Sequence, residues 1–290
     1  MKLLHQNKQF SKMSMNSEKV SLGVNYFLAI LYSLILLIPI YYMVVSSFKS
    51  NVEIYNSPLG LPQNFTFEKY VGVQERVDIL RTVLVSFQIT IGAEFINFIF
   101  GYMAAYAISR IPSKLGKIAE TIFTTGFLIP AFAILVPIYL LAIKVGLFNN
   151  PLSLMFFLSA SRLPVTIIIL STHLRNIPRD IEESATIDGA NRFQIMWEIM
   201  FPLINSGTIT VLVINFISFW NEYLFGWILL SGNPEARTLQ MAIPLLRTPQ
   251  NVDFGMLSAA VVISLIPTLI IFMFFQDRIV TGMTAGAVKG

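Results

Sequence analysis

The chain has 290 residues, of which 55% are hydrophobic and only 12% are charged. Soluble domains carry about 25% charged residues, so this composition excludes an ordinary water-facing surface and places most of the chain in a lipid bilayer. The net charge of +4, without a basic stripe and interleaved aromatic residues, argues against nucleic-acid binding. Because the sequence has no cysteine, it can form neither a disulfide nor a thiolate site.

Six apolar stretches are long enough to cross a bilayer. A hydrocarbon core about 30 Å thick is spanned by about 20 residues in a helix. The sequence therefore predicts an all-α membrane protein with six transmembrane helices at Val24–Phe48, Thr82–Ile108, Ile118–Ile143, Leu152–Leu174, Leu203–Leu229 and Met256–Phe275. Prolines interrupt several stretches, and they indicate either kinked packing helices or kinks that shape a cavity or permit rocking.

Charge around the apolar stretches predicts the topology. The first 23 residues carry four lysines and one glutamate, and cytoplasmic flanks collect Lys and Arg. The basic turn Arg110–Lys117 is expected on the same side. The first apolar run is too long for a signal-peptide core and is expected to be an uncleaved anchor. The expected segments are a cytoplasmic tail at 1–23, an anchor at 24–48, an external loop at 49–81, a membrane core at 82–276 and a cytoplasmic tail at 277–290.

Polar and amphipathic side chains inside the predicted spans are candidates for a substrate path, because ionisable groups in a bilayer are costly and usually functional. They are Glu94, Asn97, Arg162, Trp220, Asn221 and Glu222. One interpretation is a buried Glu–Arg pair or polar contacts between helices, and the other is the lining of a water-filled cavity. Neighbours such as Trp220 and Asn221 point to different faces of a helix, so these residues cannot all line one cavity.

A charged segment at 178–202, here called the elbow, lies between two apolar stretches and contains EESATIDGANRFQIMWEIMFP from Glu182 to Pro202. Pro178 suits the first turn of a helix, and the acidic residues after it lie at that helix's positive end. Gly189 can adopt the left-handed conformation that ends a helix, and a second helix is expected from about Asn191. The elbow is therefore predicted to be two helices joined by a glycine turn at the cytoplasmic surface.

The pattern of the elbow alone permits two interpretations. An amphipathic helix that rests on lipid headgroups would favour Lys and Arg on its polar face. The elbow begins with acidic residues instead, which favours a protein partner with a basic rim. Phe193, Met196 and Trp197 share one helical face, which is expected to dock on the chain's own helices.

The elbow resembles the cytoplasmic coupling motif of ABC importer permeases, which is E-A-A, three residues, Gly, nine residues and then I-x-L-P. The matching positions are Glu183, Ser184, Ala185, Gly189, Ile199, Phe201 and Pro202. Ser replaces an Ala and Phe replaces a Leu, with the spacing intact. Three further stretches resemble the smaller, maltose-type permease of the carbohydrate-importer branch: LVPIYLLAIKVGLFNN (Leu135–Asn150), SFWNEYLFGWILLSG (Ser218–Gly232) and GMTAGAVKG (Gly282–Gly290). The resemblance covers roughly Thr82 to Gly290.

This resemblance implies a type I ABC importer permease fold with cytoplasmic coupling helices, in the cell membrane with both termini in the cytoplasm. It implies a second homologous permease chain, a cytoplasmic ATPase dimer, an external solute-binding protein, and a sugar or oligosaccharide as the substrate. No cofactor is expected in this chain, since ATP and Mg²⁺ would bind the ATPase. Some of the polar residues in the spans are then expected to face a sugar, and Arg162 could suit an acidic one.

The resemblance also implies which residues couple the chain to the ATPase. The expected coupling residues are Glu182, Glu183, Ser184, Ala185, Asp188, Gly189 and Ala190. The acidic members are expected to pair with basic residues of the ATPase, and the small members to permit close approach. Lys289 and Gly290, in the tail, are expected to reach the ATPase surface as well.

Other functions remain as alternatives. The same architecture could import a polyol or a sugar phosphate, and a self-contained secondary carrier or an intramembrane enzyme would belong to other classes. No phosphate-binding G-x-x-x-x-G-K-[ST] loop is present, so the chain is not expected to hydrolyse ATP. The only histidines, His5 and His173, do not have zinc-protease spacing.

Overall fold

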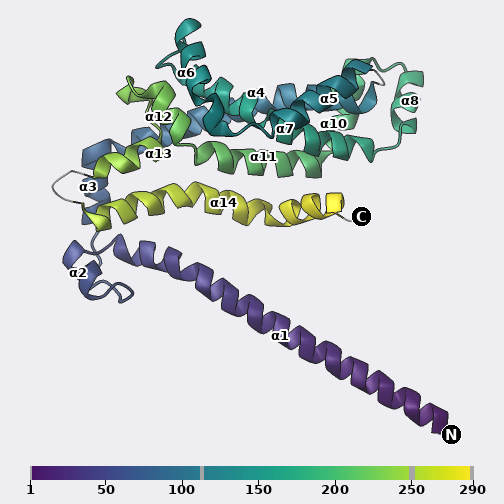
Figure 1. Ribbon diagram of the computed structural model, residues 1–290, viewed down its shortest axis with the longest axis horizontal. Coiled ribbons are helices and arrows are strands. Elements are labelled where there is room, and N and C mark those ends of the chain that lie inside the picture. The colour runs from purple at the N-terminus through teal and green to yellow at the C-terminus, as the bar shows by residue number, and fades with distance from the viewer. Residues whose placement is uncertain (1, 112–113, 248–251, 288–290) are drawn as a thin grey trace. The chain divides into compact units, whose positions relative to one another are not determined.

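The computed structural model describes residues 2–111, 114–247 and 252–287, with side chains described for 22–111, 114–247 and 252–276. Helices make up the secondary structure of these residues, which confirms the all-α prediction (Figure 1). The chain divides into two compact units. The first comprises the chain up to Gly72 together with Val252–Val262, and the second comprises the remainder.

The first unit contains helix α1 (Lys2–Ser46), helix α2 (Asn51–Asn56), the start of α3 (Glu68–Val77) and the start of α14 (Phe254–Ala287). The apolar side chains of Leu22–Ser46 are mostly exposed, as expected for a helix whose solvent is lipid. Directly after α1, Lys49 is fully buried, and its ammonium donates to the carbonyl oxygens of Ser57 (2.7 Å) and Gly60 (2.5 Å). These two hydrogen bonds therefore hold the loop that follows α2 around the Lys49 ammonium group.

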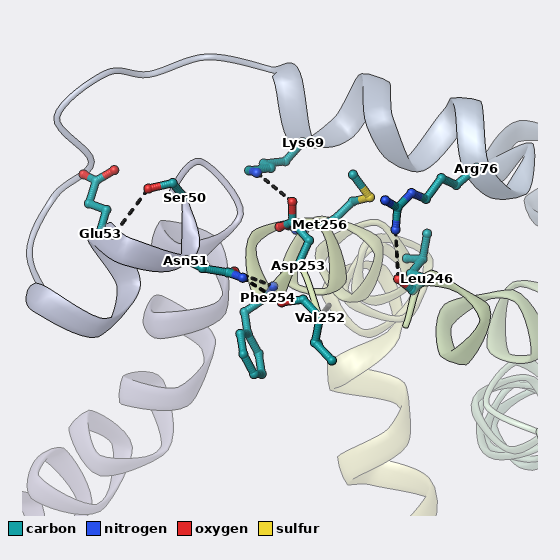
Figure 2. Close-up of polar contacts among 10 residues, drawn as sticks. All are labelled: Ser50, Asn51, Glu53, Lys69, Arg76, Leu246, Val252, Asp253, Phe254 and Met256. Carbon is teal, nitrogen blue, oxygen red and sulfur yellow. Dashed lines mark hydrogen bonds and ion pairs between the residues drawn. The ribbon is translucent and has the colours of Figure 1, made fainter. Parts of the chain in front are cut away.

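A polar cluster joins this loop to the first turn of α14 (Figure 2). The Asn51 amide donates to the Val252 carbonyl (2.7 Å) and accepts from the Phe254 backbone N–H (2.8 Å). Lys69 forms an ion pair with Asp253 at 2.8 Å, and Asp253 also accepts from the Met256 backbone N–H. The cluster thus caps α14 and closes a connection across about 200 residues of sequence.

Helices α4 (Ile79–Arg110) and α7 (Pro151–Arg175) pack along one another at the centre of the second unit. The helices that follow the first unit in chain order are α4 (Ile79–Arg110), α5 (Lys114–Gly126), η1 (Ala131–Ile134), α6 (Leu135–Lys144), α7 (Pro151–Arg175), α8 (Asp180–Ile187), α9 (Arg192–Gln194), the π-helix η2 (Ile195–Met200), α10 (Phe201–Leu203), α11 (Asn205–Trp220), α12 (Leu224–Leu230), η3 (Pro234–Ala236), α13 (Leu239–Ala242) and η4 (Ile243–Leu246). Gly101 permits the close approach of α4 and α7, since a Cβ there would lie 2.5 Å from Thr166 Cγ2.

Four of the six expected spans are confirmed as helices that are long and apolar enough to cross a membrane. They are Leu22–Ser46, Ile79–Arg110, Pro151–Arg175 and Phe254–Gln276. The other two expected spans are not single helices. The bent pairs that could each count as one span are Lys114–Gly126 with Ala131–Lys144 and Arg192–Leu203 with Asn205–Trp220. The described residues therefore give up to six spans if each bent pair counts as one.

The expected span Ile118–Ile143 is wrong as a continuous helix, because α5 and the η1–α6 segment meet at a bend of 100°. Pro130 is the N-cap of η1, where its missing N–H prevents the helix from continuing. The expected span Leu203–Leu229 is likewise interrupted after Trp220. Asn221 ends α11, and the Glu222 carboxylate accepts from the Phe225 backbone N–H (2.7 Å) at the start of α12.

A buried polar network fastens α4, α7 and α11 together. Thr166 donates to Asn97 Oδ1 (2.6 Å), and Asn215 donates to both Asn97 Oδ1 and Thr166 Oγ1 (3.0 Å each). Asn97 itself donates to the Ser159 carbonyl at 2.7 Å, and the three side chains that form the network are 0% exposed. Asn97, a substrate-path candidate from the sequence, therefore makes a contact between helices, because no part of it is accessible to a solute.

Replacement of Thr166 by Val should destabilise the bundle, because Asn97 and Asn215 each lose a buried partner while the side-chain volume is kept. The expected loss is about 1 kcal/mol, seen as a lower apparent melting temperature of the purified chain in lipid nanodiscs. Thr172→Val is the matched control, since that exposed threonine bonds only to the Ile168 carbonyl of its own helix. Equal melting temperatures for the two variants would contradict the structural role of the network.

Candidate functional site: the elbow and a cavity between helices

The first arm of the elbow is α8. Asp180, Glu182 and Glu183 lie in its first turn, where the helix dipole favours negative charge. Gly189 follows with φ at +89°, and the Ala190 backbone N–H returns to the Ala185 carbonyl at 3.0 Å. No heavy atom lies within 4 Å of a Cβ built on Gly189, so the glycine is required for its backbone conformation alone.

The second arm begins at Asn191, as the sequence predicts. Asn191 Oδ1 accepts from the Phe193 and Gln194 backbone N–H groups, and Gln194 Oε1 accepts from the Asn191 N–H, which completes a capping box. The helix then widens into the π-helix η2, and the Arg192–Leu203 segment meets α11 at a bend of 79°. Both ends of the Gly189 turn are therefore fixed by hydrogen bonds.

The seven coupling candidates differ in their exposure. Glu183, Ser184, Asp188 and Gly189 are exposed, and Ile187 beside them is 86% exposed. Ala185 is buried among side chains of the second arm, so its small size serves packing within the chain. Ala190 is half-buried and packs against the same cluster. The exposed end of the elbow thus combines two carboxylates with an apolar tip.

Glu182 is engaged within the chain. Its Oε1 lies 2.6 Å from Arg110 Nε, and its Oε2 accepts from the Tyr106 hydroxyl at 3.1 Å. Only 17% of the Glu182 side chain is exposed. The charge of Glu182 is therefore balanced by α4 in this structure, in contrast with the exposed carboxylates of Glu183 and Asp188.

The apolar face of the second arm packs on the chain's own helices only in part. Met196 is buried, and the Trp197 ring lies 5.0 Å from the Tyr102 ring of α4. Phe193, expected on the same face, is 66% exposed, because the wider turn of η2 changes the angular spacing after Gln194. Phe193 therefore adds to the exposed apolar surface of the elbow.

A cavity of ≈ 500 Å³ lies among α5, α6, α7 and the end of α11. Arg162 of α7 and Glu222, which follows α11, both line it, and most of the remaining wall is apolar. Arg162 Nε donates to Ser218 Oγ at 2.8 Å, and its Nη2 contacts the same hydroxyl. The stacked rings of Phe157 and Phe225, 3.9 Å apart, form part of the wall. The cavity therefore presents a cation, an anion and aromatic surface together.

The other substrate-path candidates lie elsewhere. Trp220 is 1% exposed, and its Nε1 donates to the Ser264 carbonyl at 2.9 Å, so it is a packing residue. Asn221 is exposed and donates to the Ile217 carbonyl. Both carboxylate oxygens of Glu94 are buried. Neither these three nor Asn97 is among the described residues that line the cavity.

Lys289 and Gly290 lie outside the described residues. Across the described part of the chain, no group of three His, Asp or Glu side chains is placed to hold a metal ion.

The sequence interpretation missed the role of Tyr102, Tyr106 and Arg110 on α4. These residues contact the elbow and are spaced by four, so they lie on one helical face. Arg110 was interpreted as part of a basic turn that sets the topology. Its side chain is instead 6% exposed and buried against Glu182. The spacing by four was visible in the sequence, but the position of its partner was not.

The bent spans and the capped elbow together define the fold of a type I ABC importer permease. A solved bacterial ABC transporter involved in the import of the acidic polysaccharide alginate has a chain of this fold, with a TM-score of 0.79 over 90% of this chain and 97% of that one at 24% identity. Residues 97–285 match the model for the inner membrane component of binding-protein-dependent transport systems, and the chain belongs to that family. It is accordingly a multi-pass inner-membrane transport component and is not itself an enzyme.

Curated relatives match nearly the whole chain. A putative ABC transporter permease of Caldicellulosiruptor sp. is 33% identical over 91% of this chain and 95% of its own length. The trehalose/maltose transport system permease of Thermococcus litoralis is 32% identical over 90% of this chain and 95% of its own length. A diacetylchitobiose uptake system permease of Streptomyces coelicolor is 28% identical over 97% and 93%. Each alignment includes the elbow and the helices that flank it.

Replacement of Gly189 by Ala should loosen the elbow, because a Cβ disfavours the left-handed conformation by about 1 kcal/mol. Cleavage within the elbow by a protease at limiting concentration should then become about fivefold faster. Gly126→Ala is the matched control, since a Cβ there meets open space and Gly126 does not have a positive φ. Equal cleavage rates for the two variants would contradict the requirement for a left-handed residue at Gly189.

Proposed function

We propose that the chain is a membrane-spanning permease subunit of an ATP-driven, solute-binding-protein-dependent importer of sugars or oligosaccharides. It forms half of the translocation path and is coupled to an ATPase through the elbow at 178–202. The observation that carries this proposal is the elbow itself, whose base is buried against α4 and whose acidic, apolar end is exposed. The sugar class is supported by relatives named for trehalose and maltose, diacetylchitobiose, and melibiose, raffinose and stachyose.

The exposed end of the elbow has the chemistry to dock in a cleft of the ATPase. Glu183 and Asp188 would form charge-assisted contacts with basic residues at the rim of the cleft. Ile187 and Phe193 would enter its interior, and burial of each exposed apolar side chain contributes about 1.5–3 kcal/mol before ordering costs. Ser184 and Gly189 leave space for the partner's backbone between these contacts.

The proposed assembly contains a second homologous permease chain, an ATPase dimer and an external solute-binding protein. ATP and Mg²⁺ bind the ATPase dimer, and this chain holds no cofactor. The elbow, the tail at 1–23 and the tail at 277–290 lie on the cytoplasmic side, and the loop at 49–81 lies outside. Lys289 and Gly290 are candidates for a further contact with the ATPase.

The cavity with Arg162 and Glu222 is proposed as this chain's part of the substrate path. Its ≈ 500 Å³ falls within the range of about 300–1,000 Å³ typical of small-molecule sites. The guanidinium donates hydrogen bonds and the carboxylate accepts them, which suits the hydroxyl groups of a sugar. Phe123 and Phe127, which also line the cavity and are not buried, supply aromatic surface for the C–H face of its ring.

A sugar phosphate or a polyol is the second candidate substrate, in the same architecture. The Arg162 guanidinium could bind a phosphate, as it could bind the carboxylate of an acidic sugar. Glu222 lines the same cavity and would repel either anion, so the pair favours a neutral solute, a sugar or a polyol, over a sugar phosphate. A self-contained secondary carrier is disfavoured because it would have no use for the elbow.

Replacement of both Glu183 by Gln and Asp188 by Asn should weaken binding of the ATPase subunits, because each loses a charge-assisted contact. A combined loss of about 1.5–3 kcal/mol corresponds to a tenfold or greater decrease in affinity. The measurement is recovery of ATPase subunits with the affinity-tagged permease pair in detergent. Glu120→Gln removes an exposed carboxylate of α5 and is the control. Undiminished recovery with the doubly substituted elbow would remove the basis of the proposed coupling role.

Substitution of Arg162 by Met or Glu222 by Gln should reduce uptake of the transported solute about tenfold in proteoliposomes that contain the whole importer, since each removes a charged hydrogen-bonding group. The panel should include neutral disaccharides, a uronic-acid oligomer and a sugar phosphate. Gln240→Ala, at a half-buried residue outside the cavity, serves as the control. Uptake of the sugar phosphate in preference to every neutral sugar would favour the second candidate substrate.

A further inference from the structure

Three side chains of α4 point to one segment of the chain and are not used by the proposed docking surface. Tyr102, Tyr106 and Arg110 are separated by four residues each, so they form a stripe along one side of the helix. Each of them forms a hydrogen bond or ion pair with the elbow or its entry. They are called the α4 stripe below.

At the first arm, two members of the stripe hold a single carboxylate. Arg110 Nε lies 2.6 Å from Glu182 Oε1, and the Tyr106 hydroxyl donates to Glu182 Oε2 at 3.1 Å. The Arg110 and Glu182 side chains are only 6% and 17% exposed, so water screens the pair weakly. Removal of either partner would leave the other charge poorly solvated, which is strongly destabilising.

Arg110 also holds the entry to the elbow. Its Nη2 donates to the Ile177 carbonyl at 3.0 Å, just before α8 begins. One guanidinium therefore fixes both the entry and the first turn of an eight-residue helix. Isolated helices of this length are unstable in water, so α8 depends on such contacts for its position.

At the second arm, the stripe holds the π-helix η2. The Tyr102 hydroxyl donates to the Met196 carbonyl at 2.5 Å, and the same carbonyl accepts from the Phe201 backbone N–H. The fully buried Tyr102 ring also packs against Trp197 and Phe201, with ring centroids 5.0 and 5.7 Å away. Tyr102 therefore fixes the turn that connects the second arm to α11.

We propose that the α4 stripe is the fastening through which displacement of the elbow moves the membrane helices, so that Tyr102, Tyr106 and Arg110 are positioning residues for coupled transport. This role rests on the proposed function. Because both arms and the entry bind one helix, a force applied to Ile187 or Asp188 moves α4 together with the elbow. Without the Glu182 contacts, α8 is held mainly by the packing of Ala185, so it rotates more easily about Gly189 and displacement of its tip moves α4 less.

The absence of cysteine allows a direct test of the fastening. Cysteines introduced at Ile187 and Ala107, both exposed, accept nitroxide labels on α8 and α4. Pulsed electron paramagnetic resonance then measures the distance between the labels in the full chain in nanodiscs. We expect a narrow distribution for the labelled parent and a broad one for Arg110→Met and for Glu182→Gln. The combined exchange Arg110→Glu with Glu182→Arg should narrow it again.

Two further variants keep this test decisive. Arg175→Met removes the exposed Arg175–Glu120 pair near the same end of the bundle and should leave the distribution narrow. Tyr106→Phe removes only a hydroxyl and reports on the fastening should Arg110→Met fail to fold. An unchanged distribution in the Arg110, Glu182 and Tyr106 variants, or a combined exchange as broad as the single substitutions, would overturn the fastening.

A functional measurement separates this proposal from the proposed function. In proteoliposomes with the partner permease, ATPase and solute-binding protein, Arg110→Met should transport at least tenfold less solute per ATP hydrolysed, and the combined exchange should restore the ratio. A normal ratio in Arg110→Met would overturn the coupling role even if the labels show a loosened elbow. Failure of the chain to bind any ATPase would instead refute the proposed function, while the label distances would still decide whether the fastening exists.

Discussion

Helix α4 has to satisfy its polar side chains without help from water, and much of the second unit is arranged around the way it does so. In a hydrocarbon environment an unpaired polar group is costly, so partners from other parts of the chain stabilise Asn97 and Arg110 on α4. Asn97 finds its partners on α7 and α11, and Arg110 finds its partners in the elbow. The same helix therefore fixes both the packing of the bundle and the position of the segment that leaves it.

This arrangement gives a physical connection between the two proposed sites. The elbow is joined to α11 in sequence and to α4 by the side chains described above. The cavity wall includes Ser218 and Glu222, near the other end of α11, and Arg162 on α7, which shares the Asn97 network. A displacement at the elbow therefore has two packed routes to the cavity, one through α11 and one through α4 and α7.

The sequence predicted those features that depend on local chemistry. Gly189, the helix before it and the capped helix from Asn191 follow from glycine conformation and capping, and the structure confirms them. Four spans follow from the length of their apolar runs. The bend at Pro130 and the break after Trp220 did not, because hydropathy averaged over a window gives the same value for a straight and a broken helix.

The sequence could not predict features that depend on which other residue a side chain contacts. Asn97, Trp220, Arg162 and Glu222 all appeared as polar or amphipathic residues in apolar runs, with no sign of the direction in which each would face. The structure separates them: the first two are buried between helices, and the last two line one cavity. The depth at which Arg110 would be buried was hidden for the same reason, since its partner lies 72 residues away in Glu182.

The 100° bend between α5 and α6 also affects the shape of the cavity. Residues from both sides of the bend, including Phe123 and Ile134, form part of its wall. A wall made from two half-helices can widen or narrow by rotation about the few residues near Pro130, while the hydrogen-bonded turns on either side stay intact. An uninterrupted helix could change the width of such a chamber only by tilting along its whole length or by breaking its own backbone ladder.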